Sequence, residues 1–131
     1  MIRGKYRTYI LINKNLARGK SAAAVAQAVL KLVQKHNGES SLKRWAISDY
    51  NKVICSVTSE QMKMAKERDA EHVSIYDKAI GTGEVATIFV PKKMWSKFFT
   101  FLPLYGSDKK KARGKRPAKT ANYGGMGGYD L

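Results

Sequence analysis

The stretch Tyr6–Asn13, YRTYILIN, places β-branched and aromatic residues around a continuous apolar centre. A strand that faces water on one side alternates apolar and polar residues, whereas a strand covered on both faces is apolar throughout. The stretch therefore predicts a central strand that is covered on both of its faces.

The residues after this strand predict a helix over 20–35. Apolar side chains recur there at helical spacing, and the first half is nearly all alanine, which allows close approach to a sheet. Ser21 or the loop before it is expected to cap the helix, and Asn37-Gly38 to end it. The apolar positions are Ala22, Val25, Ala26, Val29, Leu30, Leu32 and Val33.

The rest of the first 106 residues alternates strands and helices. The predicted elements are a short turn or helix at 42–47 with Trp45 against the core, a strand at 52–58, a helix that begins at Ser59 with a capping signal, strands at 72–77 and 85–90, and an apolar helix at 92–104. The glycine loop between the last two strands is too short for a crossover, so they should form an antiparallel hairpin. This order, β-α-β-α-β-β-α, predicts an α/β fold with a four-stranded mixed sheet.

Composition divides the chain into a compact domain, residues 1–106, and a tail, residues 107–131. Seven Lys or Arg lie between Lys109 and Lys119, and Tyr123 and Tyr129 then lie among four glycines. Such a segment buries too little apolar surface to offset the entropy of ordering, so we expect it to be disordered. Cations neutralise phosphates and tyrosines stack on bases, which favours an RNA-binding tail. The alternative is a plain solubilising terminus.

The chain has 131 residues and a formal net charge of +15. The tail holds 7 basic and 2 acidic residues, and residues 1–106 hold 18 and 8, so the domain is basic by itself. This charge attracts polyanions, and the lack of a cation-rich lipid-facing helix disfavours a membrane. The single cysteine, Cys55, lies in an apolar run and is expected to be buried and inert. With no signal peptide and no apolar span, we expect a cytoplasmic protein.

Four stretches, in the same order and at suitable intervals, resemble one known family. They are Leu16–Lys20 with the helix start SAAAVAQA, Leu42–Trp45 with Asn51–Ile54, Val73–Asp77, and Leu102–Tyr105. The family is that of the type II peptidyl-tRNA hydrolases, and the resemblance covers about residues 5–105. It implies a four-stranded mixed sheet with helices on both faces, binding of tRNA, and hydrolysis of the ester that joins a peptide to tRNA.

The residues that the resemblance assigns to catalysis match the family in part. Lys20 matches its functional lysine and Asp77 its aspartate, but Ala24 and Gln27 stand where the family has glutamine and histidine. The loop after Asp77 is shorter and lacks the family's arginine and proline. Thr82 and Thr87 are both candidates for its threonine, and Lys20, Asp77 and Thr82 would form the catalytic set. Ester hydrolysis needs a base, a held water and a polarised carbonyl. Because the match to the family's catalytic residues is incomplete, the sequence favours RNA binding without hydrolysis.

Residues 18–20 also suggest a phosphate pocket, because a helix start carries free N–H groups and a partial positive charge. A solvated loop with two surface cations is the alternative. Two histidines, His36 and His72, and one cysteine make no metal set at ligand spacing, and we expect no cofactor. The candidate RNA-binding residues are Arg3, Lys5, Arg7, Lys14, Arg18, Lys20, Lys43, Arg44, Lys109, Lys110, Lys111, Arg113, Lys115, Arg116, Lys119, Tyr123 and Tyr129.

Together these features predict a largely sequence-nonspecific RNA-binding protein, with mRNA or tRNA as partner. The tail's charge, aromatic residues and glycines also favour condensates with RNA, and the pattern is consistent with a phage protein in the host cytoplasm. Two alternatives remain: a peptidyl-tRNA hydrolase, and an adaptor that docks or self-associates through the aromatic residues of its last helix. Those aromatic residues are Trp95, Phe98, Phe99 and Phe101.

Overall fold

The computed structural model of the chain describes residues 5–81 and 83–106. Four strands and four helices lie in these ranges, in the predicted order. They are β1 (Thr8–Asn13), α1 (Arg18–Lys35), α2 (Ser40–Ile47), β2 (Lys52–Val57), α3 (Ser59–Arg68), β3 (His72–Ile75), β4 (Ala86–Phe89) and α4 (Lys97–Thr100). The tail, for which the sequence predicts disorder, lies outside the described residues.

The strands form one mixed sheet in the order β2-β1-β4-β3. β1 and β2 are parallel, with Thr8 opposite Lys52. β4 runs antiparallel to both of its neighbours, β1 and β3. The predicted α/β class, the mixed sheet and the β3–β4 hairpin are therefore confirmed.

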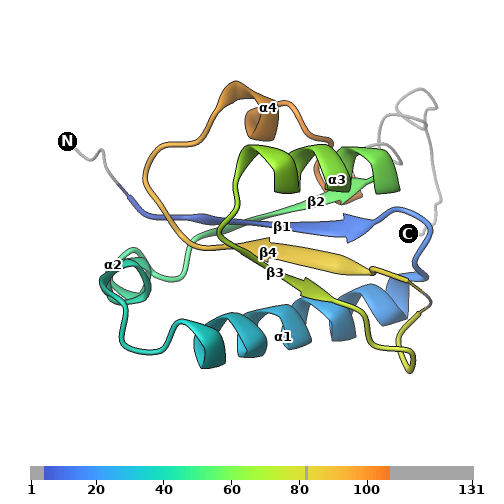
Figure 1. Ribbon diagram of the computed structural model, residues 1–131, viewed down its shortest axis with the longest axis horizontal. Coiled ribbons are helices and arrows are strands. Elements are labelled where there is room, and N and C mark those ends of the chain that lie inside the picture. Colours follow the sequence, from blue (N-terminus) through green and yellow to red (C-terminus); the bar gives the residue numbers. More distant parts are fainter. Residues whose placement is uncertain (1–4, 82, 107–131) are drawn as a thin grey trace, which may run out of the picture.

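Helices cover both faces of the sheet, α1 and α2 on one side and α3 and α4 on the other (Figure 1). Alternate side chains of β1 supply the two cores: Ile10 and Ile12 pack towards α1, and Tyr9 and Leu11 pack towards α3 and α4. From Thr8 to Ile12 every residue of β1 is buried. The prediction of a central strand covered on both faces is confirmed.

α1 packs mainly over β1, β4 and β3, through its buried residues Ala24, Ala28 and Leu32. Alanine at two of these three positions lets the helix backbone approach the sheet closely. In the described ranges, no helix combines the length and the hydropathy that crossing a membrane requires.

Two helix starts differ in detail from the sequence-based expectation. α1 begins at Arg18 rather than Lys20, and the loop residue Ala17, not Ser21, occupies the N-cap position. Ser21 lies inside the helix, where its hydroxyl donates to the Ala17 carbonyl over 3.2 Å. α3 begins at Ser59 as expected, but the cap is Thr58, whose hydroxyl accepts a hydrogen bond from the N–H of Gln61 over 3.0 Å.

The predicted helix over 92–104 is wrong for most of its length, since α4 covers only Lys97–Thr100. Backbone pairing explains the difference. The Lys92 N–H donates to the Arg7 carbonyl over 3.1 Å, which holds the chain extended beside β1, and Pro103 and Tyr105 pair with the outer edge of β2. The aromatic side chains still fill the core: Phe99 is buried, and Trp95 and Phe98 pack beside it.

Cys55 lies on β2 and is fully buried, as predicted. Burial raises the pKa of its thiol to about 12, because the charged thiolate loses its hydration there. The thiol therefore stays protonated and unreactive at neutral pH.

Candidate nucleic-acid interface

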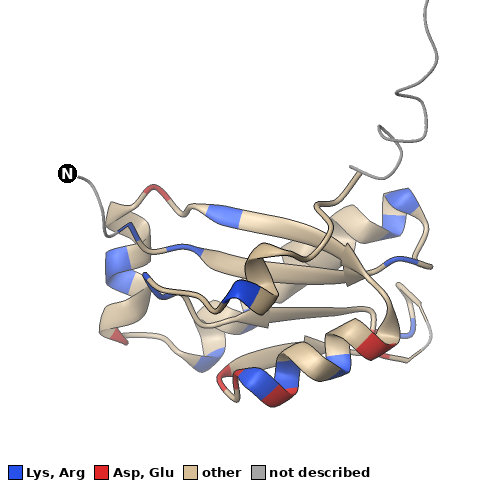
Figure 2. Ribbon diagram, turned by 90° about the horizontal axis from the view of Figure 1, so that it is seen from above, with Lys and Arg blue, Asp and Glu red and all other residues tan. Residues whose placement is uncertain are grey.

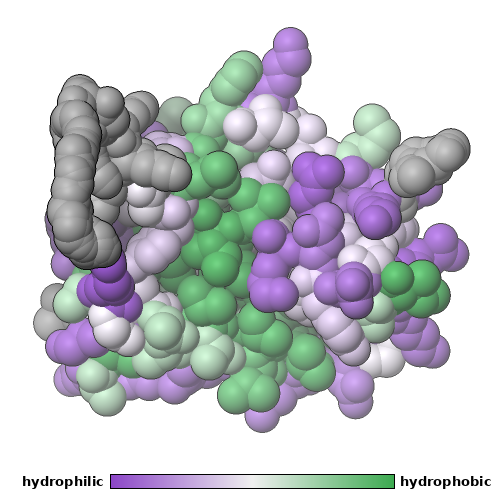
Figure 3. All heavy atoms as spheres, turned by 180° about the vertical axis from the view of Figure 1, so that it is seen from behind, coloured by the Kyte–Doolittle hydropathy of each residue, from purple (hydrophilic) through white to green (hydrophobic). Residues whose placement is uncertain are grey.

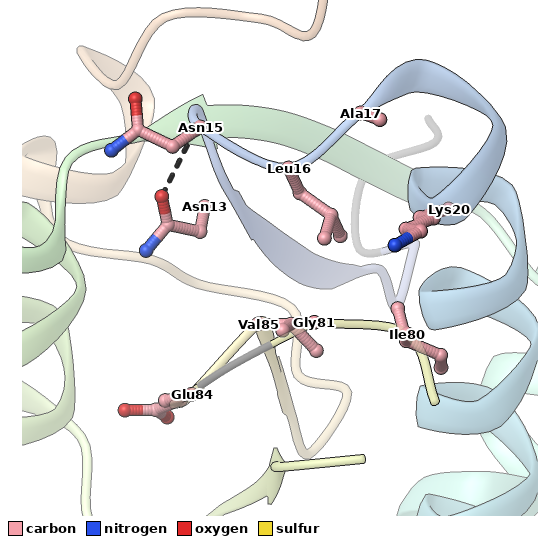
Figure 4. Close-up of a pocket in the computed structure, with 9 residues that line it drawn as sticks. All are labelled: Asn13, Asn15, Leu16, Ala17, Lys20, Ile80, Gly81, Glu84 and Val85. Atoms are coloured by element: carbon pink, nitrogen blue, oxygen red, sulfur yellow. Dashed lines mark hydrogen bonds between the residues drawn. The ribbon is translucent and has the colours of Figure 1, made fainter. Parts of the chain in front are cut away.

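A cavity of about 460 Å³ opens where β1 ends and α1 begins. Figure 4 shows Lys20 and Ile80 on one side of it, and Asn13 and Glu84 on the other. The remaining lining residues are Asn15, Leu16, Ala17, Gly81 and Val85. The cavity thus joins the start of α1 to the loop between β3 and β4, the two segments in which the sequence places functional residues.

The start of α1 is positively charged and has no acidic neighbour in its first turn. Arg18, Gly19 and Lys20 form that turn, and Ala17 at the N-cap offers no side-chain acceptor to its N–H groups. Neither Arg18 nor Lys20 forms an ion pair with a described residue. Free N–H groups and two cations favour an anion at this end of the helix.

Asp77 does not line this cavity. Its Oδ2 accepts a hydrogen bond from Gln27 Nε2 over 2.8 Å, and its Oδ1 accepts one from the Ala79 N–H over 2.9 Å. Lys20 and Asp77, the two matched residues of the hydrolase resemblance, therefore do not meet in one described cavity. Thr82, the third candidate catalytic residue, lies outside the described residues.

A second polar cluster, which the sequence did not reveal, surrounds Glu84. Lys66 Nζ donates to Glu84 Oε1 over 2.5 Å and Thr87 Oγ1 donates to Oε2 over 2.6 Å. Burial by itself raises the pKa of Glu84, but the hydrogen bonds from Lys66, Thr87 and Ser74 outweigh it and hold the pKa below its usual range. Thr87 is fully buried in this cluster, so its hydroxyl serves the Glu84 carboxylate and does not reach a ligand.

Strand pairing gathers other cations at the opposite end of β1. Arg7 pairs with Lys92 in an isolated antiparallel bridge, and Lys52 lies opposite Thr8. The guanidinium of Arg44 in α2 lies 6.0 Å from the centre of the Tyr6 ring. Lys92, which sequence reasoning missed, also lies at this end, but Asp69 Oδ2 lies 2.6 Å from its Nζ.

Two cation groups result, one at each end of β1 (Figure 2). We call Lys14, Arg18 and Lys20 the carboxyl-end group, and Lys5, Arg7, Arg44 and Lys52 the amino-end group. β1 has six residues, so the two groups are separated by about 20 Å. Lys43 is exposed on α2, next to Arg44. Arg3 and the candidate residues of the tail lie outside the described ranges.

Acidic residues are distributed differently from the cations. The described residues contain 17 Lys or Arg and 8 Asp or Glu, a net charge of +9. Six of the eight acids lie between Glu60 and Glu84, on α3 and the segments that follow it, whereas the first 38 residues contain none. Figure 2 shows most of the acidic positions on and around α3. The start of α1 and the residues next to the two ends of β1 therefore lie in the more basic part of the described chain.

Within residues 5–81 and 83–106, no three His, Cys, Asp or Glu side chains gather as metal ligands would. No protein-family model matches the chain, and the search of curated proteins also gives no match.

Proposed function

We propose that this chain binds the backbone phosphates of RNA, with little dependence on the base sequence of the RNA. The observation that carries the proposal is the excess of unpaired cations. Of the 17 described Lys and Arg residues, only Lys66 and Lys92 lie within ion-pair distance of a described carboxylate. Cations without acidic partners remain available to phosphates. When they bind, the nucleic acid releases counterions, and this release increases the affinity of the complex.

The carboxyl-end group is the strongest candidate for a phosphate contact. Arg18 and Lys20 stand at the start of α1, where N–H groups and the helix dipole add to their charge. The cavity beside Lys20, about 460 Å³, gives a phosphate room to approach. The amino-end group would contact the same strand some nucleotides away.

We expect residues 107–131, the tail, to make a second contact with the RNA. Its seven clustered cations would meet further phosphates, and Tyr123 and Tyr129 would stack on bases. Because tail and domain are tethered, the second contact forms at an effective concentration in the millimolar range. The full chain should therefore bind more tightly than residues 1–106, and residues 1–106 should retain measurable binding.

Hydrolysis of peptidyl-tRNA fits the described geometry less well than binding does. A hydrolase needs a base in reach of the attacking water. Glu84 is the one carboxylate lining the cavity beside Lys20 in the described chain, and Lys66 and Thr87 already occupy its oxygens. Their hydrogen bonds lower its pKa, which makes it a weak base.

A pair of matched double variants of the full chain tests the proposal. Arg18→Ala with Lys20→Ala removes two cations from the start of α1, and Lys63→Ala with Lys97→Ala removes two exposed cations from α3 and α4. The first pair should weaken binding to single-stranded RNA about tenfold at 0.15 M salt and reduce the salt slope by about 1.4. The second pair should retain nearly wild-type affinity. Equal effects of the two pairs would mean that only net charge matters, and would contradict a phosphate site at α1.

A further inference from the structure

An apolar groove of about 380 Å³ lies between α1 and β2. It exists because α1 packs mainly over β1, β4 and β3 and leaves Ile54 of β2 partly uncovered on that face. The lining residues are Ile12, Arg18, Ser21, Ala22, Val25, Ile54 and Tyr105. Figure 3 shows an apolar stripe across the middle of this side of the molecule, between more polar surfaces.

Phosphate binding does not account for this groove. From Ser21 to Leu30, α1 contains no charged residue, and Ala22, which lines the groove, is exposed. Exposed apolar surface next to a groove marks a place where another segment or molecule packs. The whole chain has a net charge of +15. An uncharged stretch of helix beside an apolar groove therefore indicates a surface on which another segment packs.

The described chain ends at this groove. The Tyr105 N–H donates to the Ile54 carbonyl over 2.9 Å, and Tyr105 is one of the residues that line the groove. Tyr105 and Gly106 also line an adjoining cavity of about 250 Å³, together with Lys14 and Arg18. The described chain therefore ends at the rim of the groove, and 25 residues, 107–131, follow it in the sequence.

We propose that residues 123–131 of the same chain dock in the groove between α1 and β2. Tyr123 follows Gly106 by 17 residues, and a coil of that length spans about 20–25 Å on average. A tethered segment of this reach is present at a millimolar effective concentration. Even a weak apolar contact then suffices to fill the groove.

The chemistry of this segment matches the groove better than the rest of the tail does. Residues 123–131, YGGMGGYDL, contain two tyrosines and a methionine and no Lys or Arg. Asp130 is their single charged side chain, and it complements Arg18 in the groove and Lys14 next to it. The seven cations of residues 109–119 would be repelled by the same rim. A second copy of the domain would bring two such cationic rims together, which disfavours it as the occupant.

Paramagnetic relaxation in the full chain, without RNA, tests the docking. A spin label on Ala121→Cys leaves both tyrosines and Met126 unchanged, and the buried native thiol of Cys55 stays unlabelled. The methyl signals of Ala22, Val25 and Ile54 should lose most of their intensity, whereas those of Met62 and Ala65, on the opposite face of the sheet, should not. Because RNA is absent, the result is independent of the proposed function.

Two variants and one mixing control complete this test. Tyr123→Ser with Tyr129→Ser should restore the groove signals, and so should Ala22→Lys, which adds a cation at an exposed helix position that lines the groove. In a mixture of spin-labelled, isotopically unlabelled chains with isotopically labelled chains that carry no spin label, the groove signals should keep their intensity. The docking proposal is overturned if the groove signals never weaken, if they weaken only in the mixture, as docking between copies requires, or if they stay weak in the double tyrosine variant.

Discussion

Gln27 in α1 donates a hydrogen bond from Nε2 to Asp77 Oδ2, 50 residues later in the chain, over 2.8 Å. Both side chains are partly buried, and the bond fastens α1 to the loop that follows β3. Gln27 carries an amide, which does not change its charge near neutral pH, so the pair is suited to holding the loop and not to moving a proton.

Gln27→Ala should therefore reduce stability by about 1–2 kcal/mol, because it leaves Oδ2 of the partly buried Asp77 carboxylate without its donor. Urea unfolding followed by circular dichroism measures this as a lower midpoint at unchanged m-value. Gln34→Ala, at an exposed position of the same helix, is the matched control and should change stability by less than about 0.5 kcal/mol. Equal midpoints for the two variants would show that the bond to Asp77 contributes nothing.

Acid should weaken the fold in part through Glu84. Since its folded-state pKa lies below the usual 4.5, the ionised form is favoured in the folded state, and this contribution is fully present above pH 4.5. It is lost as the pH falls below 4.5 through the folded-state pKa. Urea unfolding from pH 7 down to pH 3 should show a smaller loss for Glu84→Gln, which is already less stable at pH 7, than for the wild type.

Glu67→Gln removes an exposed carboxylate from the neighbouring helix α3 and serves as the control for this experiment. Its stability should fall with pH as that of the wild type does. A Glu84→Gln profile parallel to the wild-type profile would mean that the cluster with Lys66 and Thr87 does not favour the ionised carboxylate.

Gly81 is required where the β3–β4 loop passes the start of α1. A Cβ atom at this position would lie 2.9 Å from both Leu16 Cδ1 and Val85 Cγ1, so Gly81→Ala should cost about 1–3 kcal/mol. Gly19→Ala, in the first turn of α1 with nothing within 4 Å of the added carbon, should be neutral or stabilise the fold by up to about 1 kcal/mol. Thermal unfolding of the two variants measures the difference, and a Gly81→Ala protein as stable as the wild type would contradict the close packing.

The full chain should release no peptide from peptidyl-tRNA above the rate in buffer, since the described part of the cavity offers no free base. Lys20→Ala should weaken tRNA binding without any change in that rate. The assay needs a hydrolase of established activity as its positive control. Peptide release by the wild type that Lys20→Ala and Asp77→Ala both abolish would instead establish the enzymatic alternative.

The fold could be predicted from sequence patterns that each lie within one segment of the chain. The continuous apolar run of β1 and the helical spacing of α1 each report burial directly, because the residues concerned are neighbours on one element. The helix predicted over 92–104 was wrong because its apolar residues do pack into the core, but from a mostly irregular segment whose backbone pairs with Arg7 and with β2. Such pairing partners are distant in sequence and leave no local signal.

The candidate site was predicted less completely for the same reason. Lys20 and Arg18 could be found because a helix start is visible in the sequence. The bond from Gln27 to Asp77, the Lys66–Glu84 pair and the approach of Lys92 to Arg7 all join residues from different elements. Only the register of the sheet and the packing of the helices on it bring them together.

The most direct test of RNA binding is a titration of the full chain, freed of copurified nucleic acid, with single-stranded RNA at several salt concentrations. We expect measurable affinity at 0.15 M salt, and a logarithm of the binding constant that falls linearly with the logarithm of the salt concentration, by about 0.7 for each phosphate contacted. Absence of binding at 0.15 M salt, or affinity that does not change with salt, would contradict the central claim that the unpaired cations of this chain hold RNA phosphates.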